Sequence, residues 1–166
     1  MGAMSVASSL GLVEFLVLGG LAFWMTLAVV NNVIGFRGAV IAIGHLMNME
    51  SLRQPPTGES PLLSRAVGGA GWHRFVMALT LLFEIVSGLL LWWATLMIAG
   101  NTWGKVDRAE ALVVVNLALA ALIALLFFFL LGGTWFVYYV KQESLQISHV
   151  AMIALAIGAV ILCNAV

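Results

Sequence analysis

The residue with the clearest chemical potential in this sequence is Glu84, which lies near the middle of an apolar run covering residues 75–99. A run of that length can cross a bilayer as a helix. A charged side chain at the centre of such a helix costs about 2.5–3.5 kcal/mol on insertion scales, so it faces neighbouring helices or a cavity and often marks a functional site. Glu84 could therefore bond helices together, relay protons or bind a ligand.

Polar residues around Glu84 are spaced to share one face of that helix. Thr80, Glu84 and Ser87 follow one another at intervals of four and three residues, which is the spacing of a single helical stripe. We expect this stripe, together with Asn116 of a later apolar run, to form buried polar contacts between helices, each worth about 0.6–2 kcal/mol. A proton-relay or ligand-binding role for Glu84 is the alternative.

Three histidines offer a second chemistry. His45 precedes the run that contains Glu84, His73 opens that run, and His149 opens the last apolar run, so the topology brings all three to the same membrane face. Two imidazoles can ligate a haem iron, and three can hold a metal ion. Histidines at helix ends also cap helices or meet lipid headgroups, and haem ligands usually lie deeper in a bundle. We therefore expect no cofactor and no metal, with haem b or a quinone near these histidines as the alternative.

Composition identifies the broad class of protein. Of 166 residues, 63% are hydrophobic and 8% are charged, whereas soluble domains carry roughly 25% charged residues. The seven basic and seven acidic residues balance, which leaves no large positive field to attract nucleic acid. Cys163 is the single cysteine, so an internal disulfide and a paired-cysteine motif are both excluded.

Four apolar runs are long enough to cross a membrane, which takes roughly 20 residues. They cover about residues 10–34, 75–99, 111–140 and 147–166. The first is too long for the core of a signal peptide, so we interpret it as a retained helix. Short connections follow the second and third runs and make neighbouring helices antiparallel. The sequence thus predicts an all-α, four-helix transmembrane bundle that forms a single domain, residues 1–166.

The long connection between the first two runs, residues 35–74, is polar or interfacial in character. Within it, residues 39–49 are too few to span the membrane and could form an interfacial helix or extend the first helix. Three prolines and a glycine within residues 54–61 break any helix there.

Charges that flank the runs predict the orientation of the bundle. Four spans place both termini on one side of the membrane and the long connection on the other. Five basic residues flank the side of the long connection, and two flank the side of the termini. Cytoplasmic loops carry the excess of Lys and Arg. We therefore expect the long connection in the cytoplasm and both termini on the periplasmic side.

A series of short motifs runs along almost the whole chain. It consists of Asn31-Asn32 at the end of the first helix, His45-Leu46-Met47-Asn48-Met49-Glu50, Trp72 with Arg74, Glu84, and Gly132-Gly133-Thr134-Trp135-Phe136, followed by Gln146 near a turn. This series resembles the pattern of a bacterial family described as predicted small integral membrane proteins of unknown function. The resemblance implies four helices in a bacterial inner membrane and supplies no reaction.

The chain departs from the family pattern at two places. The family has an acid before Trp-Phe where this chain has Thr134, and its Trp-Asn-Gly-Gln turn is reduced here to Glu143-Ser144-Leu145-Gln146. If that acid carries a shared activity, this chain has lost it.

Many residues of these motifs gather, by topology, at the membrane face of the long connection. They are Asn31, Asn32, His45, Glu50, Trp72, Arg74 and Trp135. We expect them to form one interfacial polar patch.

The sequence favours a non-enzymatic role. It contains no glycine-rich phosphate loop, nucleophile elbow or HExxH zinc motif, and no stretch outside the apolar runs is long enough for a soluble catalytic domain. We expect an accessory or structural subunit that packs within membrane lipid against other transmembrane subunits or a second copy of itself, for example in an energy-converting complex. The alternatives are a haem- or quinone-binding membrane anchor and a small proton-coupled carrier or channel that uses Glu84.

Overall fold

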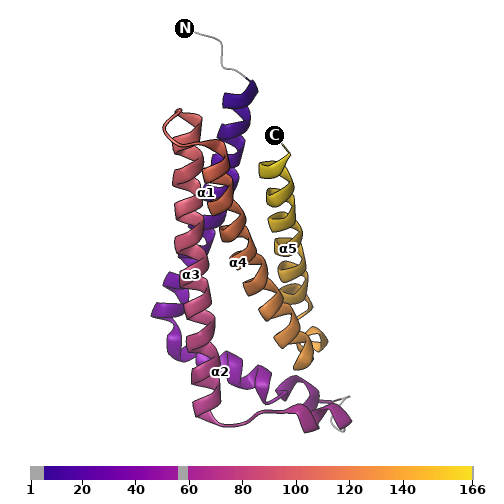
Figure 1. The fold of residues 1–166 in the computed structure, drawn as a ribbon. Coiled ribbons are helices and arrows are strands. Elements are labelled where there is room, and N and C mark those ends of the chain that lie inside the picture. The colour runs from indigo at the N-terminus through magenta and orange to yellow at the C-terminus, as the bar shows by residue number, and fades with distance from the viewer. Residues whose placement is uncertain (1–5, 56–59, 166) are drawn as a thin grey trace.

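The computed structural model describes residues 6–55 and 60–165, and four long helices dominate this part of the chain. They are α1 (Val6–Ile34), α3 (Ala70–Thr102), α4 (Arg108–Trp135) and α5 (Glu143–Asn164). Each is long and apolar enough to cross a membrane. The predicted all-α transmembrane bundle is therefore confirmed, and α1 begins at the same end of the bundle at which α5 ends (Figure 1).

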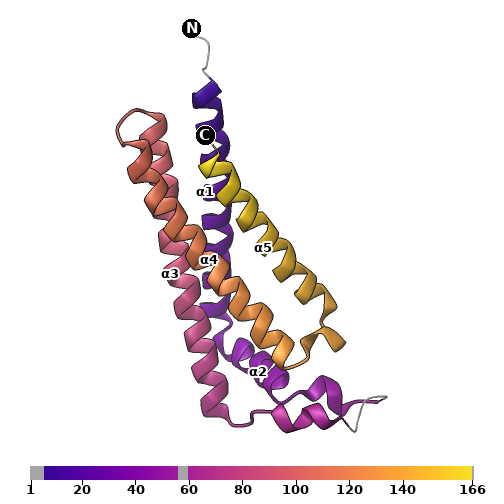
Figure 2. The same cartoon turned by 45° about the vertical axis from the view of Figure 1, so that its right-hand side comes forward.

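The connection between α1 and α3 folds into short helices at the opposite end of the bundle (Figures 1 and 2). These are α2 (Phe36–Met47), η1 (Glu50–Arg53) and η2 (Pro61–Arg65). The chain turns at Gly35, so the apolar stretch within this connection is a separate helix and not an extension of α1. Part of the proline-rich segment, residues 56–59, lies outside the described residues.

The core of the bundle runs along α1, α3 and α4. α1 packs against α3, α3 against α4, and α4 against α5, in the order of the chain. Fully buried residues from these helices, such as Leu18, Leu91, Ile98, Leu119 and Leu122, fill the space between them. α5 is the least buried of the four long helices and contacts mainly α4.

The predicted helix limits differ from the observed ones most clearly at the end of α4. Apolar residues continue to Val140, but the α-helix ends at Trp135 and a short 3-10 helix, η3 (Tyr138–Val140), follows. Val137 adopts a left-handed conformation with φ of 60°, which an α-helix cannot contain. Hydrophobicity predicts which segments of the chain can lie in lipid. This turn shows that hydrophobicity does not predict the residue at which a helix ends.

The remaining long helices extend beyond the predicted apolar runs at their polar ends. α3 begins at Ala70 and ends at Thr102, and α5 begins at Glu143. Helices continue into the headgroup region, where the backbone still forms its internal hydrogen bonds and the side chains turn polar.

A second, small core joins the long connection to the turn after α4. Met49, Leu52 and Val137 are buried together, with Leu62 and Phe136 packed against them. Met49 is also left-handed, with φ of 54°. Such conformations cost about 1–3 kcal/mol for residues other than glycine, so the packing of this small core is what holds both turns in place.

Candidate functional site

A cavity of about 400 Å³ opens between α2, α3, α4 and the first turns of α5. We call it the Glu84 chamber. Most of its wall is apolar and includes Ile43, Met77, Phe128, Phe129 and Phe136. A few polar side chains interrupt this wall: Asn32, Thr80, Glu84, Tyr138 and His149. A mostly apolar cavity with a small number of polar groups is the usual form of a small-molecule site.

Glu84 is held in the chamber wall by one amide. Its side chain is buried, and Asn32 Nδ2, from the last turns of α1, donates to both carboxyl oxygens at 2.8 Å. No cationic group pairs with Glu84 among the residues that the structure describes. Because a carboxylate offers about four lone-pair positions, Glu84 keeps capacity to accept further hydrogen bonds from a molecule in the chamber.

The predicted polar stripe on α3 faces the interior of the bundle. Thr80 and Ser87 are buried on the same face as Glu84, and Thr80 also lines the chamber. A second polar contact fastens α1 to α3, in which Trp92 Nε1 donates to Thr26 Oγ1 at 3.0 Å.

The far wall of the chamber carries a stack of rings. Tyr138 stacks on His149 with ring centroids 6.0 Å apart, and the ring centroids of Phe129 and His149 are 5.3 Å apart. The Tyr138 hydroxyl is 3.4 Å from His149 Nδ1. Burial raises the pKa of the Tyr138 phenol, so the hydroxyl keeps its proton and can donate. When Tyr138 donates to Nδ1, the neutral imidazole carries its hydrogen on Nε2.

Gly133 makes room for this stack. A Cβ atom at position 133 would lie 2.7 Å from carbon atoms of the Tyr138 ring. Glycine therefore lets the turn after α4 fold back until the phenol packs against the helix.

The amino-acid sequence matches a known family along almost the whole chain. The family described as "Predicted small integral membrane protein (DUF2165)" matches residues 10–165. The chain belongs to this family. The resemblance found in the sequence motifs is thereby confirmed. No curated protein and no solved structure matches the chain.

The three histidines of this family member lie in two different places. His149 lines the Glu84 chamber, whereas His45 and His73 line a separate groove between α2 and α3. Nε2 of His73 donates to the carbonyl of Val67 at 3.1 Å, and its Nδ1 faces Gly44, where an added Cβ would lie 2.8 Å away. Both ring nitrogens of His73 therefore face protein groups, and the three histidines do not converge on one site.

The structure contains no group of three His, Cys, Asp or Glu residues that could hold a metal ion within residues 6–55 and 60–165. His45 instead pairs with Glu50, with 2.7 Å between Nδ1 and Oε2.

The residues predicted to form one interfacial patch are divided among three surroundings. Asn32 enters the Glu84 chamber, while His45, Glu50 and Arg74 line the groove between α2 and α3. The other three are exposed: Asn31, Trp72, which meets Phe75 edge to face, and Trp135, which lies 4.9 Å below the Arg65 guanidinium.

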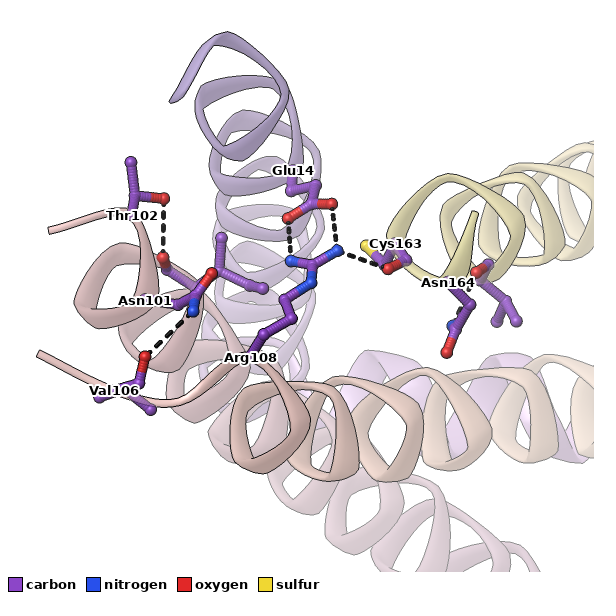
Figure 3. A network of polar contacts seen from close by, with 9 residues as sticks. Glu14, Asn101, Thr102, Val106, Arg108, Cys163 and Asn164 are labelled. Carbon is purple, nitrogen blue, oxygen red and sulfur yellow. Dashed lines mark hydrogen bonds and ion pairs between the residues drawn. The ribbon is translucent and has the colours of Figure 1, made fainter. Parts of the chain in front are cut away.

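A buried ion pair that the sequence reasoning missed lies at the end of the bundle where α1 begins (Figure 3). Glu14 is 2% exposed and accepts two hydrogen bonds from Arg108, each of 2.7 Å. Arg108 Nη2 also donates to the carbonyl oxygen of Cys163 at 2.7 Å. One guanidinium thus ties α4 to both α1 and α5. The available signal was topological, because both charges fall near span ends on the same predicted side.

Asn116, predicted to make a buried polar contact, is exposed on α4. It nevertheless contacts another helix, because its amide and that of Asn164 on α5 donate to each other at 3.0 and 2.8 Å. Together with the Glu14–Arg108 pair, this amide pair holds the last turn of α5 against the bundle.

Proposed function

We propose that this protein is a non-catalytic membrane protein that binds a lipid-soluble molecule with a polar head, of the quinol or quinone class, in the Glu84 chamber. The observation that carries the proposal is the placement of Glu84. Its carboxyl group is buried in the wall of a mostly apolar cavity. Among the residues that the structure describes, its one hydrogen-bond partner is the side-chain amide of Asn32. Burying an acidic group within a membrane helix costs free energy, and a ligand that forms a hydrogen bond with Glu84 best explains why the chain has it there.

The polar groups of the chamber suit both oxidation states of such a head. A quinol hydroxyl would donate to Glu84, and a quinone carbonyl would accept from the Tyr138 hydroxyl or from an N–H of His149. The aromatic wall formed by Phe128 and Phe129 offers faces on which a ring can stack. The volume of about 400 Å³ lies within the roughly 300–1,000 Å³ of small-molecule sites.

A transmembrane carrier role for Glu84 has weaker support. On the side of Glu84 that leads towards the termini, the interior between α1 and α3 is filled by apolar residues such as Leu18, Leu91 and Ile98, all 0% exposed. A proton or substrate that reached Glu84 from the chamber would meet this apolar core next.

A second candidate function is that of an accessory subunit that packs against other transmembrane proteins or a second copy of itself. It is favoured by the outward face of α5, where the small residues Ala151, Ala154 and Gly158 are all exposed and leave room for a close helix. Copurification from mild detergent tests it: a stable companion protein or a dimer supports this role, and a monomer without companions contradicts it.

For the orientation, we propose a bacterial inner membrane with α2 and the start of α3 at the cytoplasmic face. The side of the termini has only two basic residues, and Arg108 is neutralised there by Glu14. The opposite side carries Arg37, Arg53, Arg65, Arg74 and Lys141. This imbalance follows the rule that positive charges face the cytoplasm.

The chamber proposal is tested by ligand partition. The purified protein, in phosphatidylcholine nanodiscs, is titrated with a short-chain ubiquinol analogue, and nanodiscs without protein measure the background. We expect saturable binding to the wild type. Glu84→Gln should weaken it about tenfold or more, because a hydrogen bond to a charged group is worth about 1.5–3 kcal/mol.

Glu110→Gln is the matched control. Glu110 is an exposed glutamate in the first turn of α4, at the other end of the bundle from the chamber opening. It should bind the analogue as the wild type does. The proposal fails if the wild type shows no saturable binding above the empty nanodiscs, or if the two glutamine variants weaken binding equally.

A further inference from the structure

A second concave surface lies outside the chamber, between α2 and the start of α3. This groove encloses about 510 Å³ and is lined by residues that include Arg37, Gly44, His45, Glu50, His73 and Arg74. We call it the arginine groove. It lies at the bundle end that holds the short helices, where α2 crosses beside the beginning of α3 (Figures 1 and 2).

The floor of the groove is a fixed contact between two helices. His73 is buried, and its ring lies against Gly44 of α2 while Nε2 donates to the carbonyl of Val67. The two arginines are therefore presented by elements that hold a constant separation. This distinguishes the groove from a chance gathering of long side chains on a mobile loop.

The charges at the rim do not cancel. Glu50 is the acidic residue that lines the groove, and His45 already pairs with it at 2.7 Å. Arg37 and Arg74 are exposed, and neither guanidinium has a hydrogen bond or an ion pair with any residue that the structure describes. Guanidinium groups with free donors in one concavity are suited to bind phosphate, which they can hold with paired hydrogen bonds.

The apolar surroundings indicate where that phosphate comes from. Trp72 and Phe75 are more than half exposed beside Arg74, and Ile34 and Ile41 are exposed beside Arg37. Aromatic residues of this kind settle at the level of the lipid headgroups. A phosphate bound between the arginines would therefore have acyl chains next to exposed apolar side chains, which a free phosphate ion cannot use.

We infer that the arginine groove binds the headgroup phosphate of an anionic phospholipid from the leaflet that faces the long connection. Basic pockets between transmembrane helices on the cytoplasmic side are a recognised form of such sites. The bound lipid would bridge α2 and α3. This inference uses none of the groups that the quinol proposal requires, so the two can fail separately.

Native mass spectrometry in detergent tests the inference with two lipid probes. Phosphatidylglycerol should remain bound at concentrations where phosphatidylcholine does not. Each of the substitutions Arg37→Gln and Arg74→Gln should weaken phosphatidylglycerol binding about fivefold, as expected for a basic residue near an anionic headgroup. Lysine at both positions should restore most of the binding, which separates loss of charge from loss of fold.

Arg65→Gln is the control for diffuse attraction. Arg65 lies on the same side of the bundle but stacks on Trp135 and does not line the groove. It should keep wild-type affinity for phosphatidylglycerol. Equal binding of the two lipids by the wild type, or an equal loss in Arg65→Gln, overturns the inference. So does displacement of the lipid by millimolar inorganic phosphate, because the headgroup alone would then account for binding.

Discussion

At the scale of single residues, the chain buries two glutamates in opposite surroundings. Glu14 meets a guanidinium that also binds a helix carbonyl, so its charge is neutralised inside the protein. Within residues 6–55 and 60–165, Glu84 has the Asn32 amide as its partner, which satisfies part of its hydrogen-bonding capacity and brings no opposite charge. The first arrangement is that of a structural clamp, and the second leaves Glu84 available to the ligand that we propose.

The clamp makes a direct prediction about stability. Arg108→Met should lower the free energy of unfolding by about 3 kcal/mol, because removing one partner leaves the other as an uncompensated buried charge. Denaturation of the purified protein in mixed micelles measures the change. Lys105→Met is the control, since Lys105 is exposed in the adjoining loop and forms no ion pair within the described residues.

The double variant Glu14→Leu, Arg108→Met separates charge from packing. It should recover part of the lost stability, because an apolar pair of similar volume leaves no charge behind. If it unfolds as readily as Arg108→Met alone, the contact with Cys163 rather than the ion pair is what stabilises this end of the bundle.

The sequence predicts which single residues need polar partners better than it predicts which residues those partners are. The place of Glu84 in an apolar run already implies that it needs partners, but nothing in the run names Asn32. Glu14 lies in the first turns of α1, where a carboxylate can equally meet water, and its partner is 94 positions away. Pairing depends on how the helices rotate about their axes, which composition does not encode.

At the scale of elements, the turn between α4 and α5 shapes the chamber. Val137 reverses the chain, Tyr138 folds back against Gly133, and His149 at the start of α5 stacks on the phenol. A substitution that moves this turn should therefore change the chamber without touching Glu84.

Gly133→Ala tests the close approach. Its Cβ would lie 2.7 Å from the Tyr138 ring, so we expect a loss of about 1–3 kcal/mol in the free energy of unfolding from overpacking. Ligand binding in the chamber should weaken in parallel. Unfolding in mixed micelles and the nanodisc titration measure the two effects.

The neighbouring glycine supplies the control. A Cβ at position 132 meets no atom within 4 Å, so Gly132→Ala should leave stability unchanged or raise it by up to about 1 kcal/mol, because alanine favours the helix. Equal effects of the two substitutions would show that helix propensity, and not contact with Tyr138, explains the result.

The sequence predicts how many membrane helices the chain forms, but it does not predict the residues at which they end. Four apolar runs, each of roughly 20 residues or more, leave little choice other than four membrane helices. The end of α4 at Trp135 depends on Val137 adopting a conformation that β-branched residues rarely take. That conformation exists because the small core around Met49 and Leu52 holds it, and such a tertiary cause is invisible in local sequence.

At the scale of the whole molecule, the two ends of the bundle differ. At the end where α1 begins, the helices are held together by the Glu14–Arg108 pair and by the amide pair between α4 and α5. The other end carries the chamber, the arginine groove and most of the basic residues. Both proposed ligands would therefore bind on the side of the membrane that faces the long connection.

This asymmetry makes the orientation of the bundle a decisive measurement. In a Cys163→Ala background, which removes the single native thiol, Trp103→Cys and Ser64→Cys each place one cysteine at an exposed site near opposite ends. Neither change alters the charge balance that sets orientation. A maleimide that cannot cross the inner membrane should label Trp103→Cys in intact cells, and should label Ser64→Cys only after the membrane is disrupted. The reverse pattern would place the arginine groove in the outer leaflet, where the excess of five basic residues on that side of the bundle would contradict the positive-inside rule.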